Sequence, residues 1–280
     1  NRYTNAKLKV RGSITFDGAI NNGKFIKTWI SSACGFSISN SRTYKNDYFY
    51  NSGTTTLSTT SSWENSGTWF NAHIIDADPT STVKFNGTSN QLVTSNWDGV
   101  NNAFGNVSID NSSIPNGSTG VTVSGQDMVL KNTSSLILED GVLIPNGKMI
   151  IVNNPAANGI ILGTSNTTGT ESWVYGISDA SCLRKYINDG ENVFHFPVGG
   201  ATHGNLATIT SHGLPNGAFY LDSWFKENPS NVNLNFPDSI IDHNSIYTGV
   251  APEGVWVFNK NGIIDGTYDL KLYYNQFDTT

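Results

Sequence analysis

The chain has 280 residues and a formal net charge of −6 at pH 7, and only 14% of its residues are charged. Its 7 Trp, 11 Tyr and 14 Phe argue against a disordered polar segment. The acidic balance, without a cluster of Lys or Arg, argues against a nucleic-acid partner. The sequence also lacks a run of about 18 apolar residues, which argues against a membrane-spanning segment.

The start of the chain and its cysteines bear on where the protein works. Asn1 is not an initiator Met and no signal peptide follows it, so we expect a processed portion of a longer protein, with more chain after Thr280. Cys34 and Cys182 lie 148 residues apart and lack metal-ligand spacing. Two unpaired, buried thiols are the favoured interpretation, with a disulfide as the alternative.

The first residues already alternate between short apolar segments and turns. Residues 7–30 predict strands that are parted by Gly12, Asp17-Gly18 and Asn21-Asn22-Gly23. Residues 31–53 lose this pattern, and we expect them to form a polar insertion near 31–53. Tyr48 and Tyr50 lie in that stretch, where local packing is favoured over a sugar-stacking surface.

The pattern of short strands returns at Gly53 and continues to Gly163. Between residues 57 and 93 the candidate inward side chains are Leu57, Trp63, Trp69, Ile74, Val83, Phe85, Leu92 and Val93. From Gly117 to Gly163 six apolar clusters are separated by Gly, Asn, Asp or Pro, and every third cluster returns after about 21 or 24 residues. This spacing predicts a right-handed parallel β-helix with three strands per coil over residues 1–165.

The pattern of short apolar segments ends at Thr164–Thr170, which we interpret as a linker or edge turn. Longer strands follow at spacings of about ten residues with Gly, Asn-Gly and Asp-Gly turns. The second part, residues 170–280, is therefore predicted to be an antiparallel β-sandwich module. The whole chain is expected to be all-β.

Several segments resemble one family of proteins. GTTTL, WENSGTWFN, VKFNGTSNQ, FGNVSIDNS and GVTVSG, in that order, are similar to the β-helical regions of large Bacteroidetes surface proteins that the type IX secretion system exports. SDASCLRKYI, ENVFHFPVGG, EGVWVFNKNG and DGTYDLKLYYNQF resemble the β-sandwich module that follows. Gliding-motility and other cell-surface adhesins belong to this group. The resemblance implies an extracellular location on a bacterial cell and the type IX machinery as a partner during export.

Catalytic motifs are sparse. Asp76 and Asp78 share a side of an extended segment, but Pro79 follows and a solvated turn is favoured. Glu139-Asp140-Gly141 has the composition of a turn after a strand. The five histidines lack HxH or HExxH spacing, and His195 alternates with Phe194 and Phe196, which predicts that it points away from them. We expect no cofactor, no metal and no enzymatic activity.

The sequence offers candidates for carbohydrate binding and for O-glycosylation. Trp63, Trp69, Trp97, Tyr48 and Tyr50 are the candidates for stacking against sugar rings, as in an adhesin that binds surface polysaccharide, although buried packing is the default. Under the resemblance, the Bacteroidetes pattern of Asp, Ser or Thr, then an apolar residue or Thr makes Ser239 and Thr279 candidate O-glycosylation sites.

The function that we expect is a non-catalytic structural stalk or presenting segment of a secreted, adhesin-like surface protein. Cell adhesion by an aromatic, carbohydrate-binding face is the alternative. A β-helical polysaccharide-degrading enzyme is the third reading.

Overall fold

The structure is a computed structural model, and it describes a defined part of the chain. The described residues are 8–10, 14–16, 29–32, 36–38, 43–46, 48–51, 54–71, 74–95, 103–113, 119–164, 166, 170–187, 192–212, 219–227, 240–242, 245–247, 254–261 and 267–273. Their elements are β-strands and one 3₁₀ helix, η1 (Ala157–Gly159), so the all-β prediction is confirmed for them.

The strands from β1 to β20 all belong to three ladders of parallel strands, and β16 belongs to two of them. Ladder A contains β1 (Leu8–Val10), β3 (Trp29–Ser32), β6 (Tyr48–Asn51), β9 (Trp69–Asn71), β12 (Gln91–Ser95), β14 (Val121–Gly125), the second half of β16 (Leu136–Ile144) and β19 (Ser172–Val174). Ladder B contains β2 (Ile14–Phe16), β4 (Phe36–Ile38), β7 (Thr55–Leu57), β10 (Ile75–Ala77), bridges at Ala103 and Phe104, β15 (Met128–Leu130), β17 (Ile150–Val152) and β20 (Leu183–Ile187). Ladder C contains β5 (Thr43–Asn46), β8 (Ser62–Asn65), β11 (Thr82–Phe85), β13 (Asn106–Asp110), the first half of β16 and β18 (Ile160–Leu162).

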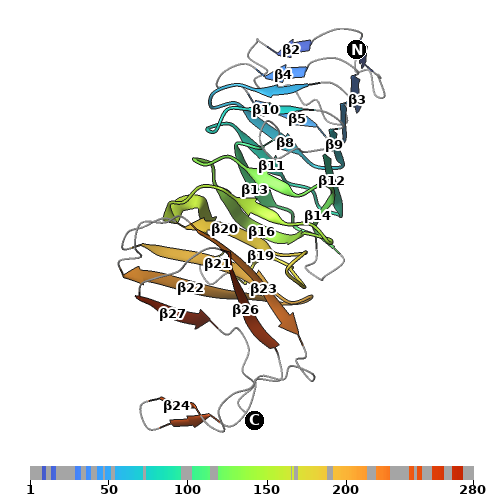
Figure 1. The fold of residues 1–280 in the computed structure, drawn as a ribbon. Helices are drawn as coiled ribbons and strands as arrows, with labels where there is room; N and C mark the ends of the chain where they lie inside the picture. The colour runs from blue at the N-terminus through green and yellow to red at the C-terminus, as the bar shows by residue number, and fades with distance from the viewer. Residues whose placement is uncertain are drawn as a thin grey trace.

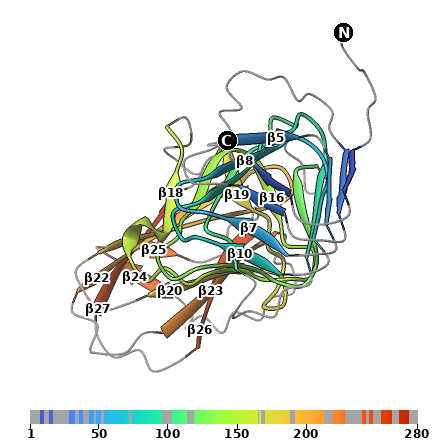
Figure 2. The ribbon, with the colours of Figure 1, turned by 90° about the horizontal axis from the view of Figure 1, so that it is seen from above.

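From β4 to β16 the chain visits ladders A, B and C in turn. Figure 1 shows the strands stacked one above another, and Figure 2, along the stack, shows β8 of ladder C and β10 of ladder B on different sides. Strand partners lie from 19 residues apart, as for Phe36 and Thr55, to 33 apart, as for Ile150 and Leu183. The return distance is therefore more variable than the sequence predicts.

Alternation of side chains explains why these short segments form strands. In β8 and β11 the inward residues are buried and the residues between them are partly exposed, which is the period of two expected for a sheet with one buried face. Phe49, Trp63 and Trp69 pack against one another inside the stack, with ring centroids 4.4 to 4.5 Å apart. They belong to a buried apolar cluster that continues to Leu183 and Val198.

The last part of the chain forms two antiparallel sheets. One consists of β21 (Val193–Gly199), β22 (Gly204–His212) and β27 (Thr267–Tyr273). The other consists of β20, β23 (Phe219–Glu227) and β26 (Gly254–Asn261). A separate hairpin joins β24 (Ile240–Asp242) and β25 (Ser245–Tyr247).

Both antiparallel sheets continue the parallel ladders. β19 of ladder A pairs with β21 through Val174 and Val198, and β20 pairs with β17 on one side and β23 on the other. Backbone pairing therefore runs from one part of the protein into the other. The boundary between residues 165 and 170 stays a prediction.

Two details differ from the sequence analysis. Regular parallel strands (β4, β5 and β6) occupy much of residues 31–53, where an insertion was expected, because Phe49 is a core residue that packs against Trp69 of the neighbouring strand β9. The inward residue of β10 is Ile75 and not Ile74, and Leu92 of β12 is 41% exposed beside the buried Val93. Adjacent apolar residues leave the phase of a two-residue repeat undecided.

Candidate functional site

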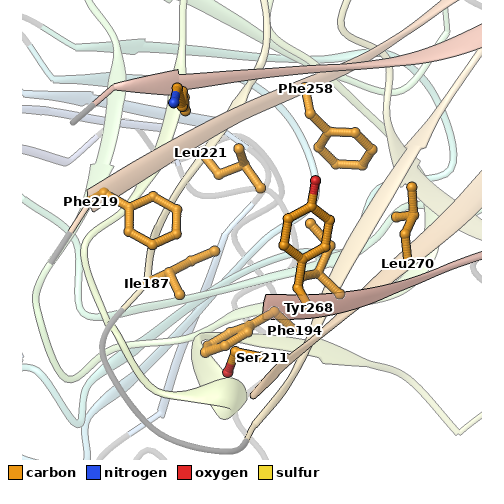
Figure 3. A pocket seen from close by; sticks show the side chains of 10 residues that line it. Ile187, Phe194, Ser211, Phe219, Leu221, Phe258, Tyr268 and Leu270 are labelled. Carbon is orange, nitrogen blue, oxygen red and sulfur yellow. The ribbon is translucent and has the colours of Figure 1, made fainter. Parts of the chain in front are cut away.

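An apolar slot lies between the two antiparallel sheets. We use this name for a cavity of about 180 Å³ lined by Ile187, Phe194, Ile209, Ser211, Phe219, Leu221, Phe258, Lys260, Tyr268 and Leu270. Figure 3 shows side chains from both sheets that point toward one another, among them Leu221 and Phe258 from one and Phe194 and Tyr268 from the other. The volume suits one aromatic ring or one large aliphatic side chain.

The polar groups of the slot are few. Lys260 is the charged residue among its described lining residues, and the Ser211 hydroxyl accepts a hydrogen bond from the backbone of Asn192 at 3.4 Å. Its described lining residues include no carboxylate and no imidazole. The slot is therefore suited to hold apolar groups, and its described residues offer no acid-base pair.

A polar cleft that shares Lys260 with the slot contains an ion pair across β20 and β23. Arg184 donates two hydrogen bonds to the carboxylate of Asp222, at 2.6 and 2.7 Å, and its guanidinium lies 5.4 Å from the centre of the Tyr220 ring. The hydrogen bond with Asp222 raises the pKa of Arg184. Because both charges are satisfied by each other, the pair fixes the register of the two strands.

Lys185 is a buried cation on the neighbouring position of β20. Its ammonium donates hydrogen bonds to the backbone oxygens of Asn154, Ala156 and Tyr186, the last two at 3.0 and 2.7 Å. Burial lowers the pKa of Lys185 to about 7. The side chain thereby holds the turn before η1 against the strand that links the parallel and antiparallel parts.

Buried side-chain amides recur where the chain turns from ladder C into ladder A. We call Asn65, Gln91, Asn111 and Asn166 the amide row. The Gln91 amide donates to the backbone oxygens of Asn65 and Gly67, at 2.8 and 3.0 Å, and its oxygen accepts from Asn111 at 2.8 Å. Asn166 repeats the arrangement farther along by donating to the oxygens of Leu138 and Ser172. Neutral hydrogen bonds thus join successive strands at this corner.

The aromatic residues proposed for sugar stacking are not brought together on one surface. Trp63 and Trp69 are fully buried, so their rings are closed to a sugar and the stacking hypothesis is wrong for both. Tyr50 is partly exposed and stacks on Phe70 at 4.7 Å with planes 3° apart, which covers one face of each ring. Trp97 and the side chain of Tyr48 lie outside the described residues.

The acidic candidates serve turns and corners. Asp78 accepts hydrogen bonds from the backbone and hydroxyl of Thr80, at 2.8 and 2.6 Å, and these bonds lower its pKa. Asp140 precedes Gly141 at the corner within β16, and burial, followed by the charge of Asp110, raises its pKa. Asp78 lies in the turn after β10, as predicted, whereas Glu139, Asp140 and Gly141 lie within the strand β16 and not in a turn after it.

The histidines and cysteines are also dispersed. His195 points away from the buried Phe194 and Phe196, as predicted, and burial lowers its pKa. Cys182 is a buried free thiol whose pKa burial raises to about 12. Cys34, Ser239 and Thr279 lie outside the described residues, so the disulfide alternative and the glycosylation sites stay predictions.

Sequence reasoning missed both Lys185 and the apolar slot. The strand 183–187 alternates Leu183, Lys185 and Ile187 on one face, and this pattern alone would have placed the lysine inside. The slot has no comparable signal, because its lining residues come from strands that are far apart in the sequence, β20 to β23, β26 and β27.

Together these features define a fold that is all-β over the described residues, with buried apolar clusters and neutral polar corners. Among the described residues no group of three His, Cys, Asp or Glu could hold a metal ion, and no helix is long and apolar enough to cross a membrane. Comparisons with models of protein families, with curated proteins and with solved structures find no match.

Proposed function

We propose that this chain is a non-catalytic stalk or presenting segment of a secreted, adhesin-like cell-surface protein. In this proposal, the three parallel ladders form a right-handed parallel β-helix with three strands per coil. The two antiparallel sheets form a β-sandwich that ends the rod. The observation that carries the proposal is the unbroken pairing of ladder A from β1 to β19 and on into β21 and β22.

Such an arrangement supports a stalk because hydrogen bonds between successive strands run along the axis of the stack. Each strand adds about 4.8 Å of height, and its backbone hydrogen bonds point to the strands above and below. The amide row adds neutral side-chain bonds in the same direction. With 14% charged residues and no metal required by these contacts, a rod of this kind would be stiff in varied ionic conditions.

The proposed cellular location and export route rest on the sequence resemblance alone. We propose an extracellular place on a bacterial cell surface of the Bacteroidetes type and export by the type IX secretion machinery. Adhesive or other functional parts of the parent protein would then be held away from the cell. The absence of enzymatic activity belongs to the same proposal.

Rigidity can be tested by measuring a distance along the rod. Spin labels at Lys45→Cys and Lys271→Cys, in a Cys34→Ser background, would be compared by electron-spin distance measurement at low and high salt. Cys182 is buried with a raised pKa and should not take up label. We expect a narrow distance distribution at both salt concentrations, no wider than that of a Lys45→Cys, Lys84→Cys control pair. A broad or salt-dependent distribution would contradict the stalk.

Carbohydrate binding is the alternative that the Tyr50–Phe70 stack favours. The two rings lie on outward positions of β6 and β9 and leave their outer edges accessible. A glycan array probed with the whole chain tests it: a signal that Tyr50→Ala abolishes would support binding at this stack. A signal that persists in that variant would place the binding elsewhere.

A further inference from the structure

In the antiparallel sheet of β21, β22 and β27, the side chains of the inner face become more exposed toward the last strand, β27. Phe194, Ile209 and Leu270 form a row across β21, β22 and β27, and the exposed fraction rises from 0% at Phe194 to 46% at Leu270. Tyr268, on the same face of β27, is 56% exposed. Both side chains line the apolar slot (Figure 3), and about half of each remains exposed.

In the facing sheet of β20, β23 and β26, the inner side chains also become exposed toward the last strand, β26. The row Lys185, Leu221 and Lys260 crosses β20, β23 and β26, and it changes from buried to exposed at Lys260. Lys260 lines the slot, and within the described part of the chain no carboxylate lies within ion-pair distance of it. The open side of the slot therefore combines the Leu270 side chain and the Tyr268 ring with one cation.

Within the described residues, β27 also has an open backbone edge. It pairs with β22, and no other described strand pairs with it. Its other face is polar and already engaged: Asp269 bonds to His212 at 2.8 Å, and the Lys271 ammonium lies 4.5 Å from the centre of the Tyr273 ring. An edge strand with an apolar inner face and unpaired N–H and C=O groups is a template for another strand.

We infer that β27 is the docking site for an extended β-strand of another polypeptide. This strand would pair with the free edge of β27, turn its alternate apolar side chains toward the inner face with one of them in the slot, and place an acidic side chain opposite Lys260. A strand satisfies the edge and the slot together, whereas a small apolar molecule would leave the edge unpaired. The cavity of about 180 Å³ fits one large side chain of such a strand.

The inference goes beyond the stalk and does not depend on it. Docking a strand requires the slot and the edge of β27, both of which lie in the antiparallel part. If the antiparallel part ends a rod, the docked strand would be held at that end. If the stalk were wrong, the same site would still be present.

The test uses peptides and the whole chain. Fluorescein-labelled nonapeptides in which Val, Ile, Leu or Phe alternates with Thr, with one Asp replacing a Thr, would be titrated with residues 1–280 and followed by fluorescence anisotropy. One matched control peptide has the same composition with its apolar residues contiguous. A second has N-methyl groups on the backbone nitrogens that would face β27, which removes their hydrogen bonds.

We expect alternating peptides to bind and both control peptides to bind at least about tenfold more weakly. Leu270→Arg should weaken binding by a similar factor, because it places a charge in the slot, whereas Leu92→Arg should not, because Leu92 is similarly exposed on β12. Lys260→Gln should weaken binding of the peptides with Asp more than that of their Asn counterparts.

Three outcomes would overturn the assignment. No binding of any alternating peptide at millimolar concentration would show that the edge is not a docking site. Equal binding of the N-methylated peptide would show that the slot takes apolar groups without strand pairing. Self-association of the free protein that Leu270→Arg abolishes would show that a second copy of the chain fills the slot.

Discussion

At the scale of single residues, Lys185 shows how a charge can be buried without a carboxylate among the described residues that it contacts. Three backbone oxygens accept its hydrogen bonds, and a free amine, with two hydrogens, could serve only two of them. Hydrogen bonding thus favours the ammonium, whereas burial favours the neutral amine and lowers the pKa to about 7. Protonation of this one group is therefore coupled to folding.

The first prediction is that stability rises with pH because of Lys185. Its pKa in the folded protein lies below its ordinary value of 10.5, so between these values the unfolded chain binds a proton that the folded chain does not. The free energy of unfolding should therefore increase from pH 7 to 9, by up to about 1.4 kcal/mol per pH unit. Below about pH 7 this contribution should be constant. Urea titrations at each pH would measure it.

Matched variants separate this effect from other titrations. Lys185→Met should flatten the rise between pH 7 and 9, and Lys45→Met, at an exposed ion pair with Glu64, should leave it unchanged. The range ends at pH 9 because the raised pKa of Cys182 acts in the opposite direction above that point. An equal slope in the wild type and in Lys185→Met would refute the coupling.

The second prediction concerns the amide row. Gln91→Met keeps the length of the side chain, but it leaves the backbone of Gly87 without its acceptor and two backbone oxygens without the amide donor. Because these groups are buried, we expect a loss of about 2 to 4 kcal/mol in the free energy of unfolding. Gln126→Met, at an exposed position, should change it by less than about 0.5 kcal/mol. Chemical denaturation of both variants gives the comparison.

At the scale of elements, the corner within β16 depends on a glycine. Gly141 has φ +84°, and a Cβ there would lie 2.1 Å from the backbone oxygen of Asn111. Gly147 has a similar φ of +76° but open space around it. The first half of β16 pairs in ladder C and the second half in ladder A, so Gly141 is where one strand changes sheets.

The third prediction compares these two glycines. Gly147→Ala should cost about 1 kcal/mol of stability, from its backbone conformation alone. Gly141→Ala should cost at least about 2 kcal/mol more, since the corner must also move away from Asn111. Thermal and urea unfolding of the pair would measure the difference. Equal losses in the two variants would mean that the corner adapts freely.

The elements also show what the sequence could predict. The apolar clusters from Val121 to Leu162 lie on strands in the structure, except that Met149 precedes β17. The clusters at 136–138 and 142–144, which were expected to be separate strands, share β16. It was harder to predict which residues of a strand point inward. Ile74 and Leu92 were expected to do so, but each has an apolar neighbour that takes the inward position instead. The strands β4 to β6 were missed because their aromatic and polar residues hide the alternation that buries Phe49.

At the scale of the whole molecule, the parallel ladders and the antiparallel sheets are joined more closely than the change of sequence pattern near residues 164–170 suggests. Leu183 lies on β20, which pairs in parallel with β17 and in antiparallel with β23. It is buried in the same apolar cluster as Trp63 and Val198. Local sequence patterns predicted the change of strand direction, but they could not predict that one strand belongs to both sheets, because pairing partners are distant in the chain.

The fourth prediction is that damage at this shared strand spreads in both directions. Leu183→Ala should remove about 2 to 5 kcal/mol and should reduce protection against hydrogen exchange in both β17 and β23. Phe194→Ala removes a buried ring from the cluster between the antiparallel sheets, so it should reduce protection in β22 and β23 but leave β11 and β13 unchanged. Exchange measured by mass spectrometry on peptides from these strands resolves the two patterns. If Leu183→Ala affects β23 alone, the parallel stack and the antiparallel sheets unfold as separate units despite their shared strand.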